Sequence, residues 1–458
     1  MSYTDTLFLA AFVGVCLLSH LLRPWPALKE WFLIGVSLFV IASWGFFDLA
    51  LFLAVLFINF CAVFWMMRSE DERSRLILTS TIVLDVLILT IFKYTNFLGS
   101  SLGSVTGLKI PTFPLGIPLA ISFYTFHLIS YLVDVHARRV KVATIREYVF
   151  YLSFFPHVIA GPIVRAWQLV PQIGKQRRVR TDMAMGMHYL ITGFFLKMVV
   201  ANNIGAMNDR LWAGDTTWAL SSADYWIVAF LYYCQIYGDF AGYSLMALGM
   251  ARLLGYRLPA NFRSPMRAAS IQEFWKRWHI TLSRWLRDYL YIPLGGNRVS
   301  AFRAGQNALI TMLLGGLWHG AGWGFVIWGG MHGTGIIIER YLGFTARNLG
   351  RSKVVFWWVM TQMWVTVAWV FFRSPSLTSA TSFLHHMLPS PHNLIPHMKV
   401  VALLVLALPV IAHNCFPIFM TRIGRRNLGL VLGISSGVML VLNIIIFSPT
   451  AVFIYFRF

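Results

Sequence analysis

The sequence predicts an all-α, polytopic membrane protein. Of its 458 residues, 58% are hydrophobic and only 12% are charged, whereas soluble domains carry about 25% charged residues. Apolar stretches long enough to span a bilayer, about 17–25 residues each, recur along the chain. The alternating strand pattern of an outer-membrane barrel does not recur. We therefore expect one membrane-embedded domain over residues 1–458, with about ten transmembrane helices.

Ten apolar stretches are the predicted transmembrane helices. They cover residues 6–22, 31–47, 49–67, 76–98, 117–135, 183–203, 224–251, 354–372, 400–416 and 428–448. Basic residues collect in the loops between them, as the positive-inside rule requires. The chain has 38 Lys and Arg against 17 Asp and Glu. This excess fits contact with anionic membrane lipid, so no nucleic-acid partner is expected.

Two further apolar segments have basic loops on both sides, so each should enter the membrane and return. One is 148–164, where Pro156, Gly161 and Pro162 interrupt a helix. The other is 305–338, which is too short for two full helices of about 20 residues each. We predict a short hairpin or a pair of broken helices there. Non-helical backbone at membrane depth needs cover from protein or water, so both segments indicate an interior cavity.

His319 lies near the apex of the second returning segment. The stretch Ala308–Ile338 carries no charge, and His332 is its one other titratable residue. Ionisable groups at membrane depth are costly and mark functional sites. Five glycines surround His319, and they are Gly315, Gly316, Gly320, Gly322 and Gly324. For the other buried histidines we expect hydrogen bonds between helices, and these are His20, His127, His157, His188 and His332.

The stretch Ile271–Tyr289 has the pattern of an amphipathic helix, with Phe274, Trp278 and Leu282 on its apolar face. Such a helix lies in the membrane plane on the basic, cytoplasmic side, where its simplest role is that of an anchor. His279 lies at the border of the apolar face, where an anchor would favour Lys or Arg. The basic face also suits phosphate, and the candidate binding residues are Arg277, Arg284 and Arg287.

Familiar catalytic motifs are missing from the sequence. It contains no Ser nucleophile elbow, zinc-protease helix, Walker loop or Rossmann fingerprint, and no acidic cluster that would hold a metal. A histidine can accept a proton near neutral pH and return it. The pattern therefore indicates His-driven group transfer between bound substrates. Asp239 is a weaker candidate, because a buried carboxylate between Tyr237 and Tyr243 would orient a helix or a histidine.

Two strings resemble the membrane-bound O-acyltransferase family, and within it the bacterial alginate O-acetylation-like branch. They are FWKRWHITLSRWLRDYLYIPLGGNR at Phe274–Arg298 and GGLWHGAGWGFVIWGGMHG at Gly315–Gly333. The resemblance covers a motif-bearing core of about residues 90–345, followed by C-terminal helices over 354–448. It implies that His319, in the WHG motif, is catalytic and that His279 is its companion. Trp318 and Asp239 are then orienting residues, beside a central funnel or tunnel that joins the two membrane faces.

The resemblance also implies a reaction in the bacterial inner membrane. An acetyl group would pass from a cytoplasmic thioester, acetyl-CoA or another, to hydroxyls of an extracytoplasmic polysaccharide such as alginate or cellulose. An extracytoplasmic SGNH-like acetyltransferase would be the partner, and no cofactor would be permanently bound. His319 would act as the general base or carry the acyl group briefly itself. His279 would position the donor or shuttle a proton.

Two other functions remain open from the sequence. One is D-alanyl transfer to teichoic acid from a carrier protein, within the same family. The other is a non-enzymatic polysaccharide export channel or scaffold. The predicted spans consist mostly of the apolar residues Leu, Val, Phe and Ile, whereas a pore would need polar and aromatic residues along several spans. The sequence does not identify the acceptor, the donor, the partner or the oligomeric state.

Overall fold

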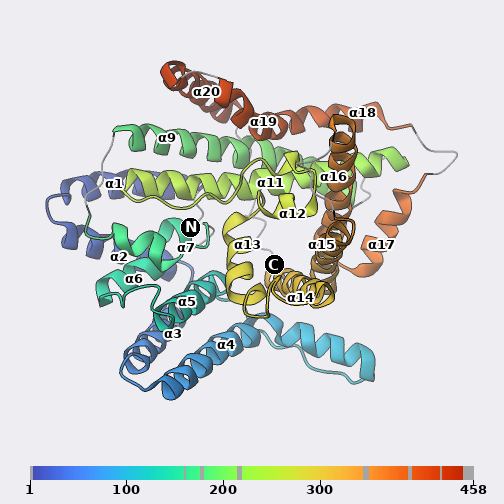
Figure 1. Ribbon diagram of the computed structural model, residues 1–458. Coiled ribbons are helices and arrows are strands. Elements are labelled where there is room, and N and C mark those ends of the chain that lie inside the picture. The colour runs from blue at the N-terminus through green and yellow to red at the C-terminus, as the bar shows by residue number, and fades with distance from the viewer. Residues whose placement is uncertain are drawn as a thin grey trace. The chain divides into compact units, whose positions relative to one another are not determined.

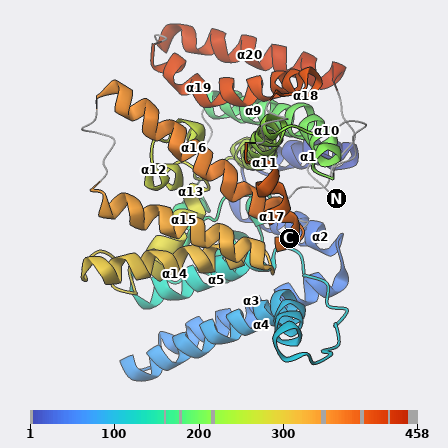
Figure 2. The same cartoon turned by 90° about the vertical axis from the view of Figure 1, so that its right-hand side faces the viewer.

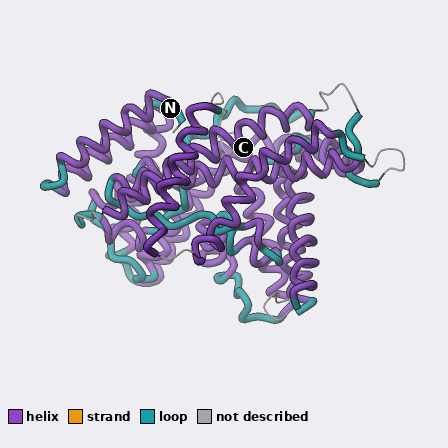
Figure 3. The backbone as a smooth tube through the Cα atoms, turned by 90° about the horizontal axis from the view of Figure 1, so that it is seen from above, coloured by secondary structure: helices purple, strands orange, loops and turns teal. Residues whose placement is uncertain are grey.

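The described chain is helical throughout, apart from its connecting loops. The computed structural model describes residues 4–158, 161–175, 180–213, 219–343, 350–389, 395–422 and 425–446. Figure 3 shows helices and loops, and no strand occurs within these ranges. The predicted all-α class is confirmed. The chain divides into two compact units, Met1–Met187 with Ala247–Pro259 and His188–Met246 with Ala260–Phe458. The single domain over 1–458 stays a prediction.

Each of the ten predicted spans overlaps helix, although 31–47 crosses the turn between the helices Pro26–Ala42 and Phe46–Met66, 117–135 begins before the helix Ile121–His136, and residues 447–448 lie outside the described chain. Among the described residues, five helices are long and apolar enough to cross a membrane, which confirms a multi-pass protein. They are Phe46–Met66, Asp71–Thr106, Asp182–Trp212, Arg351–Arg373 and Met398–Phe416. The count of ten spans stays a prediction, as does the central funnel or tunnel.

The first unit is built on five long helices. They are α1 (Thr6–Leu21), α2 (Pro26–Ala42), α3 (Phe46–Met66), α4 (Asp71–Thr106) and α5 (Ile121–His136). Helices α3, α4 and α5 pack against one another, as Figure 1 shows. Polar side chains meet inside this packing, where Asn59 donates to the Asp85 carboxylate over 2.9 Å. Buried polar groups of this kind need partners, and here they join α3 to α4.

The predicted break in segment 148–164 is confirmed. Helix α6 (Ile145–Ser153) ends before the short α7 (Phe155–Val158), and α8 (Ala166–Leu169) follows. Proline fits the first turn of a helix but not its interior, and Pro156 lies in the first turn of α7. The non-helical backbone is covered by protein: His127 Nε2 accepts from the Val164 N–H over 3.0 Å, and the Tyr151 hydroxyl donates to the Val164 carbonyl over 2.9 Å.

The second unit contains the remaining helices, apart from the parts of α9 and α11 that belong to the first unit. They are α9 (Arg180–Phe194), the π-helix η2 (Phe195–Ala201), α10 (Asn202–Trp212), α11 (Ser222–Leu253), α12 (Ile271–Trp275), α13 (Ile280–Leu286), the π-helix η4 (Arg287–Tyr291), α14 (Ala301–His319), α15 (Trp323–Tyr341), α16 (Arg351–Arg373), α17 (Leu377–His386), α18 (Met398–Ala402), α19 (Leu408–Arg422) and α20 (Arg425–Ile445). Figure 2 shows α14, α15 and α16 as neighbours, with α14 packed on α15 and α15 on α16.

The predicted hairpin at 305–338 is confirmed, but its arms are longer than expected. Helices α14 and α15 have 19 residues each, about 28 Å at a rise of 1.5 Å per residue. They extend beyond the uncharged stretch because the charged residues of α15 have partners. Arg340 donates to the Tyr291 hydroxyl over 2.9 Å and to the Ala304 carbonyl over 3.1 Å, and Glu339 accepts from the Gln272 N–H over 3.0 Å.

The prediction of one continuous amphipathic helix over Ile271–Tyr289 is wrong. The helix is broken between α12 and α13, and His279 has a left-handed backbone with φ 38°. Trp278 and Leu282, from the predicted apolar face, are fully buried in protein. A wheel assigns residues to a face only while the helix continues. The face that was expected to lie against lipid therefore belongs to the protein core.

Candidate active site

His319 is the last residue of α14 and is buried, with 3% of its surface exposed. Its ring packs against other aromatic rings, at centroid distances of 5.0 Å from Trp318, 5.0 Å from Trp328 and 5.5 Å from Phe372. The chain turns directly after it because Gly320 leaves room for the Phe325 ring, which a Cβ there would overlap. The glycines around His319 thus allow close packing of the hairpin apex.

His279 faces His319 from the start of α13. The two ring centroids are 6.4 Å apart, and Trp318 lies 6.0 Å from the His279 ring. His279 is fully buried and also contacts Phe240 at 4.6 Å. The structure therefore brings together the two histidines that the sequence singled out, with Trp318 beside both.

The helix break fixes the tautomer of His279. Its Nδ1 accepts from the Leu282 N–H over 3.3 Å and so caps α13. A neutral imidazole that accepts at one nitrogen carries its proton on the other. Nε2 is therefore the protonated nitrogen, and it has no hydrogen-bond partner among the residues that the structure describes. His279 thus presents a buried N–H donor beside His319.

Asn261 holds the backbone at the break. Its carbonyl accepts from the Ile280 N–H over 2.9 Å, and its side-chain oxygen accepts from the Thr281 hydroxyl over 2.6 Å. The Asn261 amide donates to the Ser244 hydroxyl over 3.2 Å. These contacts supply partners for backbone groups that a continuous helix would have paired internally. The loop at Asn261 therefore sets the position of His279.

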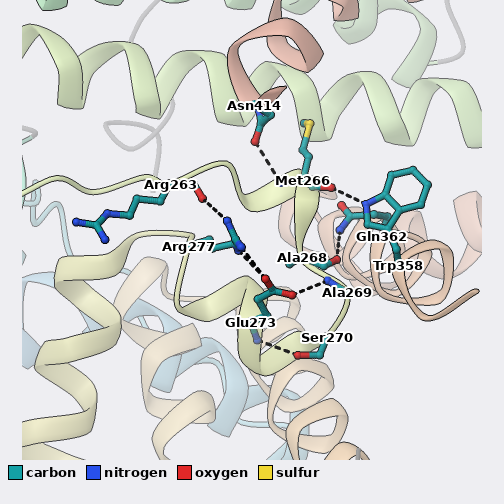
Figure 4. Close-up of polar contacts among 10 residues, drawn as sticks. All are labelled: Arg263, Met266, Ala268, Ala269, Ser270, Glu273, Arg277, Trp358, Gln362 and Asn414. Carbon is teal, nitrogen blue, oxygen red and sulfur yellow. Dashed lines mark hydrogen bonds and ion pairs between the residues drawn. The ribbon is translucent and has the colours of Figure 1, made fainter. Parts of the chain in front are cut away.

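The segment after Asn261 is itself pinned to three helices, as Figure 4 shows. Arg277 donates to Glu273 over 2.7 and 2.9 Å and to the Arg263 carbonyl over 3.2 Å. From α16, Trp358 donates to the Met266 carbonyl and Gln362 to the Ala268 carbonyl, and Asn414 of α19 accepts from the Met266 N–H. Arg277 was predicted to bind the acyl donor. In the structure its side chain instead holds the segment after Asn261 in place.

Asp239 forms a buried ion pair with Lys197 of η2. The two elements approach closely because Gly193 and Gly242 face each other, and a Cβ on Gly242 would lie 2.8 Å from the Gly193 carbonyl oxygen. Asp239 is next to Phe240, which contacts His279. The carboxylate thus joins α11 to η2 one residue before Phe240. Lys197 was missed in the sequence, because nothing in its local pattern identifies a partner 42 residues away.

His332 lies in an aromatic cage next to the histidine pair. Its ring is parallel to Phe274 at 5.7 Å and meets Trp275 and Trp328 edge-on at 5.1 and 4.8 Å. Neither ring nitrogen has a hydrogen-bond partner within the described parts of the chain. The hydrogen bond between helices that we expected for His332 is therefore not formed.

The corresponding expectation is confirmed for His157 and His188, whereas the hydrogen bond of His127 joins a helix to the loop at Val164. His127 accepts from Val164, His157 donates to the Tyr151 carbonyl over 2.9 Å, and His188 is 2.8 Å from the Ser436 hydroxyl.

A cavity of about 570 Å³ lies beside the aromatic cage. Four cationic side chains line it, and they are Lys276, Arg284, Arg287 and Arg340. Trp275 also lines it, so this ring stands between the cavity and His332. Arg284 and Arg287 were predicted on the donor side, whereas Lys276 and Arg340 were missed as binding residues. Arg340 reaches the cavity only because α15 continues past the uncharged stretch.

The described residues contain no group of three or more His, Cys, Asp or Glu side chains that could hold a metal ion. The buried histidines are suited to proton transfer, and N–H groups beside them are suited to hydrogen bonding. Group transfer is a class of reaction that such a buried histidine pair suits.

Residues 36–374 match the model of MBOAT, the membrane-bound O-acyltransferase family. The chain belongs to this family and is an O-acyltransferase. The alternative of a non-enzymatic export channel is thereby set aside.

Similar proteins include alginate and peptidoglycan acetylation enzymes. The probable alginate O-acetylase AlgI of Azotobacter vinelandii is 38% identical over 389 residues, which cover 82% of this chain and 74% of the relative. The peptidoglycan O-acetyltransferase of Helicobacter pylori is 34% identical over 84% of this chain and 79% of its own length. The teichoic acid D-alanyltransferase of Streptococcus thermophilus is 30% identical over 48% of this chain and 56% of its own length.

Proposed function

We propose that this protein moves acetyl groups from a cytoplasmic thioester, such as acetyl-CoA, toward hydroxyls of an extracytoplasmic polysaccharide. The proposed location is the bacterial inner membrane. The names of the alginate and peptidoglycan relatives support a polysaccharide acceptor, with alginate or another exopolysaccharide as the first candidate. Transfer through an extracytoplasmic SGNH-like partner is part of the same proposal.

The observation that carries the proposal is the facing pair His279 and His319 inside a buried aromatic site. An acyl transfer needs a base for the attacking hydroxyl and a hydrogen-bond donor for the carbonyl oxygen. In our proposal His319 is the base. The Nε2–H of His279, fixed by the cap on α13, donates to the developing oxyanion.

The proposed step is balanced in atoms and protons. The acceptor oxygen bonds to the thioester carbonyl carbon while His319 takes the hydroxyl proton. The carbon–sulfur bond then breaks, and His319 returns the proton to the leaving thiolate. The products are an ester and a free thiol, and His319 ends neutral. A transiently acetylated His319 would instead be seen as an added acetyl mass on the intact protein.

The basic cavity supports a phosphate-bearing donor. Lys276, Arg284, Arg287 and Arg340 line it together, and Arg and Lys bind phosphate through charge-assisted hydrogen bonds. Acetyl-CoA and a carrier-bound phosphopantetheine both carry phosphate. Acetyl transfer is favoured over D-alanyl transfer because the acetylating relatives match over 82% and 84% of this chain, against 48% for the D-alanyl relative.

The test is His319→Ala in a strain that lacks the native copy, with polysaccharide acetyl content as the readout. We expect acetylation to fall by at least about 10²-fold, because general acid–base groups contribute about 10²–10⁴-fold. His188→Ala is the control, because the hydrogen-bond partner of His188 is Ser436, which belongs neither to the histidine pair nor to the aromatic cage. Normal acetylation with His319→Ala at wild-type protein level would overturn the proposed role.

A further inference from the structure

His332 is buried in the aromatic cage, although neither of its ring nitrogens forms a hydrogen bond with the described residues. Both of them, and the indole nitrogens of Trp275 and Trp328, have no hydrogen-bond partner among the described residues. Buried polar groups are satisfied in nearly all native structures, and the exceptions need an explanation. A phenylalanine at position 332 would keep the parallel stack on Phe274 without burying two nitrogens. The nitrogens therefore indicate a partner other than the residues that the structure describes.

The position of His332 indicates where that partner comes from. Trp275 lines the basic cavity and contacts His332 at 5.1 Å. Trp328 contacts His332 at 4.8 Å and His319 at 5.0 Å. The three unsatisfied rings thus form a chain of contacts from the cavity to His319. A donor whose phosphate is held in the cavity can follow these rings to place its thioester at His319.

The chemistry of the rings matches amide groups. A neutral imidazole offers one donor and one acceptor, and each indole offers one N–H donor. The pantetheine arm of coenzyme A, or of a carrier protein, contains two amides, each with a carbonyl acceptor and an N–H donor. Indole N–H groups can donate to the carbonyls, and His332 can both accept and donate. An arm without amides would leave the same groups unsatisfied.

We propose that His332, with the indole N–H groups of Trp275 and Trp328, binds the amides of the donor's pantetheine arm between the basic cavity and His319. Trp275 closes this route in the donor-free protein, and its ring moves aside when the arm enters. His332 thus determines donor specificity without touching the reacting atoms. This inference rests on the proposed use of a cytoplasmic thioester.

The experiment compares two acetyl donors on the purified full chain in detergent, with release of free thiol as the readout. One donor is acetyl-CoA, and the other is S-acetyl-2-mercaptoethanol, an acetyl thioester without amides. For His332→Phe we expect KM for acetyl-CoA to rise by at least about tenfold, the loss that one or two hydrogen bonds bring. Turnover of the truncated donor should stay within about twofold, because it makes none of these contacts.

Further variants separate binding from folding. His332→Gln keeps one donor and one acceptor and should restore most of the affinity for acetyl-CoA. Trp275→Phe keeps an aromatic ring but removes the indole N–H. It tests the binding of the amides in place of His332→Phe if that variant does not fold. His188→Phe is the matched control, since it removes a hydrogen-bonded histidine outside the cage and should leave KM for both donors unchanged.

The outcomes are distinguishable. If both donors are affected equally in His332→Phe, or if KM for acetyl-CoA is unchanged, the inference is overturned and His332 is a core ring alone. If the wild-type protein releases thiol from neither donor, the proposed function falls and this inference falls with it. Selective loss of acetyl-CoA turnover supports both.

Discussion

Gly324→Ala tests whether the packing of α15 on α16 positions the catalytic histidine. Gly324 lies in the first turn of α15, and a Cβ there would lie 2.5 Å from the Phe371 carbonyl oxygen, whereas ordinary contact begins at 3.4 Å. The helices must therefore separate by about 0.9 Å, the difference between these distances, because a backbone oxygen cannot rotate away. Overpacking of this kind costs about 1–3 kcal/mol.

The separation should affect catalysis more than folding. Trp328 on α15 and Phe372 on α16 contact the His319 ring at 5.0 and 5.5 Å, so both neighbours of the base would shift. A displacement of about 1 Å near reacting groups can lower kcat by about 10²-fold. We expect that loss for Gly324→Ala in thiol release from acetyl-CoA, with the protein still eluting as a folded species in detergent.

Gly330→Ala, on the same helix, is the matched control. A Cβ there would lie 3.5 Å from a Leu313 methyl carbon, an ordinary contact. Alanine is more stable than glycine within a helix by about 0.5–1 kcal/mol, so this variant should fold and turn over normally. Equal kcat values for Gly324→Ala and Gly330→Ala would refute the reasoning.

Three further changes test the surroundings of the site. Asp239→Ala should destabilise the protein by about 3–5 kcal/mol, because it leaves Lys197 charged and buried without its carboxylate. Thermal unfolding should show this loss of stability. The additional change Lys197→Met should recover most of the lost stability. Asn261→Ala should cost about 1–3 kcal/mol and lower kcat as well, since the Asn261 side chain bonds to the hydroxyls of Ser244 and of Thr281, two residues after His279; a stable variant of normal kcat would contradict this. Arg284→Gln should raise KM for acetyl-CoA several-fold at low salt and less at high salt, where screening already weakens the charge; a salt-independent effect would argue against a phosphate contact.

The sequence predicts those features that depend on local composition. The absence of charge around His319 identified a buried titratable group, and Pro156 identified a break in a helix, because both effects act within a few residues. Features that depend on distant partners were not predictable. Arg340 lines the cavity because α15 continues past the uncharged stretch, and that extension depends on Tyr291 and the Ala304 carbonyl.

The break between α12 and α13 is a clear case of this limit. The apolar residues of 271–289 repeat as in one helix, and those of α12 and α13 are buried in the protein rather than facing lipid. The backbone nevertheless leaves the helix over 276–279, because the Arg263 N–H donates to the Arg277 carbonyl and the Ile280 N–H donates to the Asn261 carbonyl. Periodicity reports which face a residue occupies, but it does not report whether another segment competes for the backbone groups.

This break gives His279 its chemical role. In a continuous helix the Leu282 N–H would bond to the Trp278 carbonyl, four residues earlier. The break leaves that N–H as one of the unpaired donors of a new helix end, and Nδ1 of His279 accepts from it. The ring is thereby held with its proton on Nε2, and His279 becomes a donor rather than a second base. In the proposed mechanism the two histidines thus differ in function because one of them, His279, caps a helix.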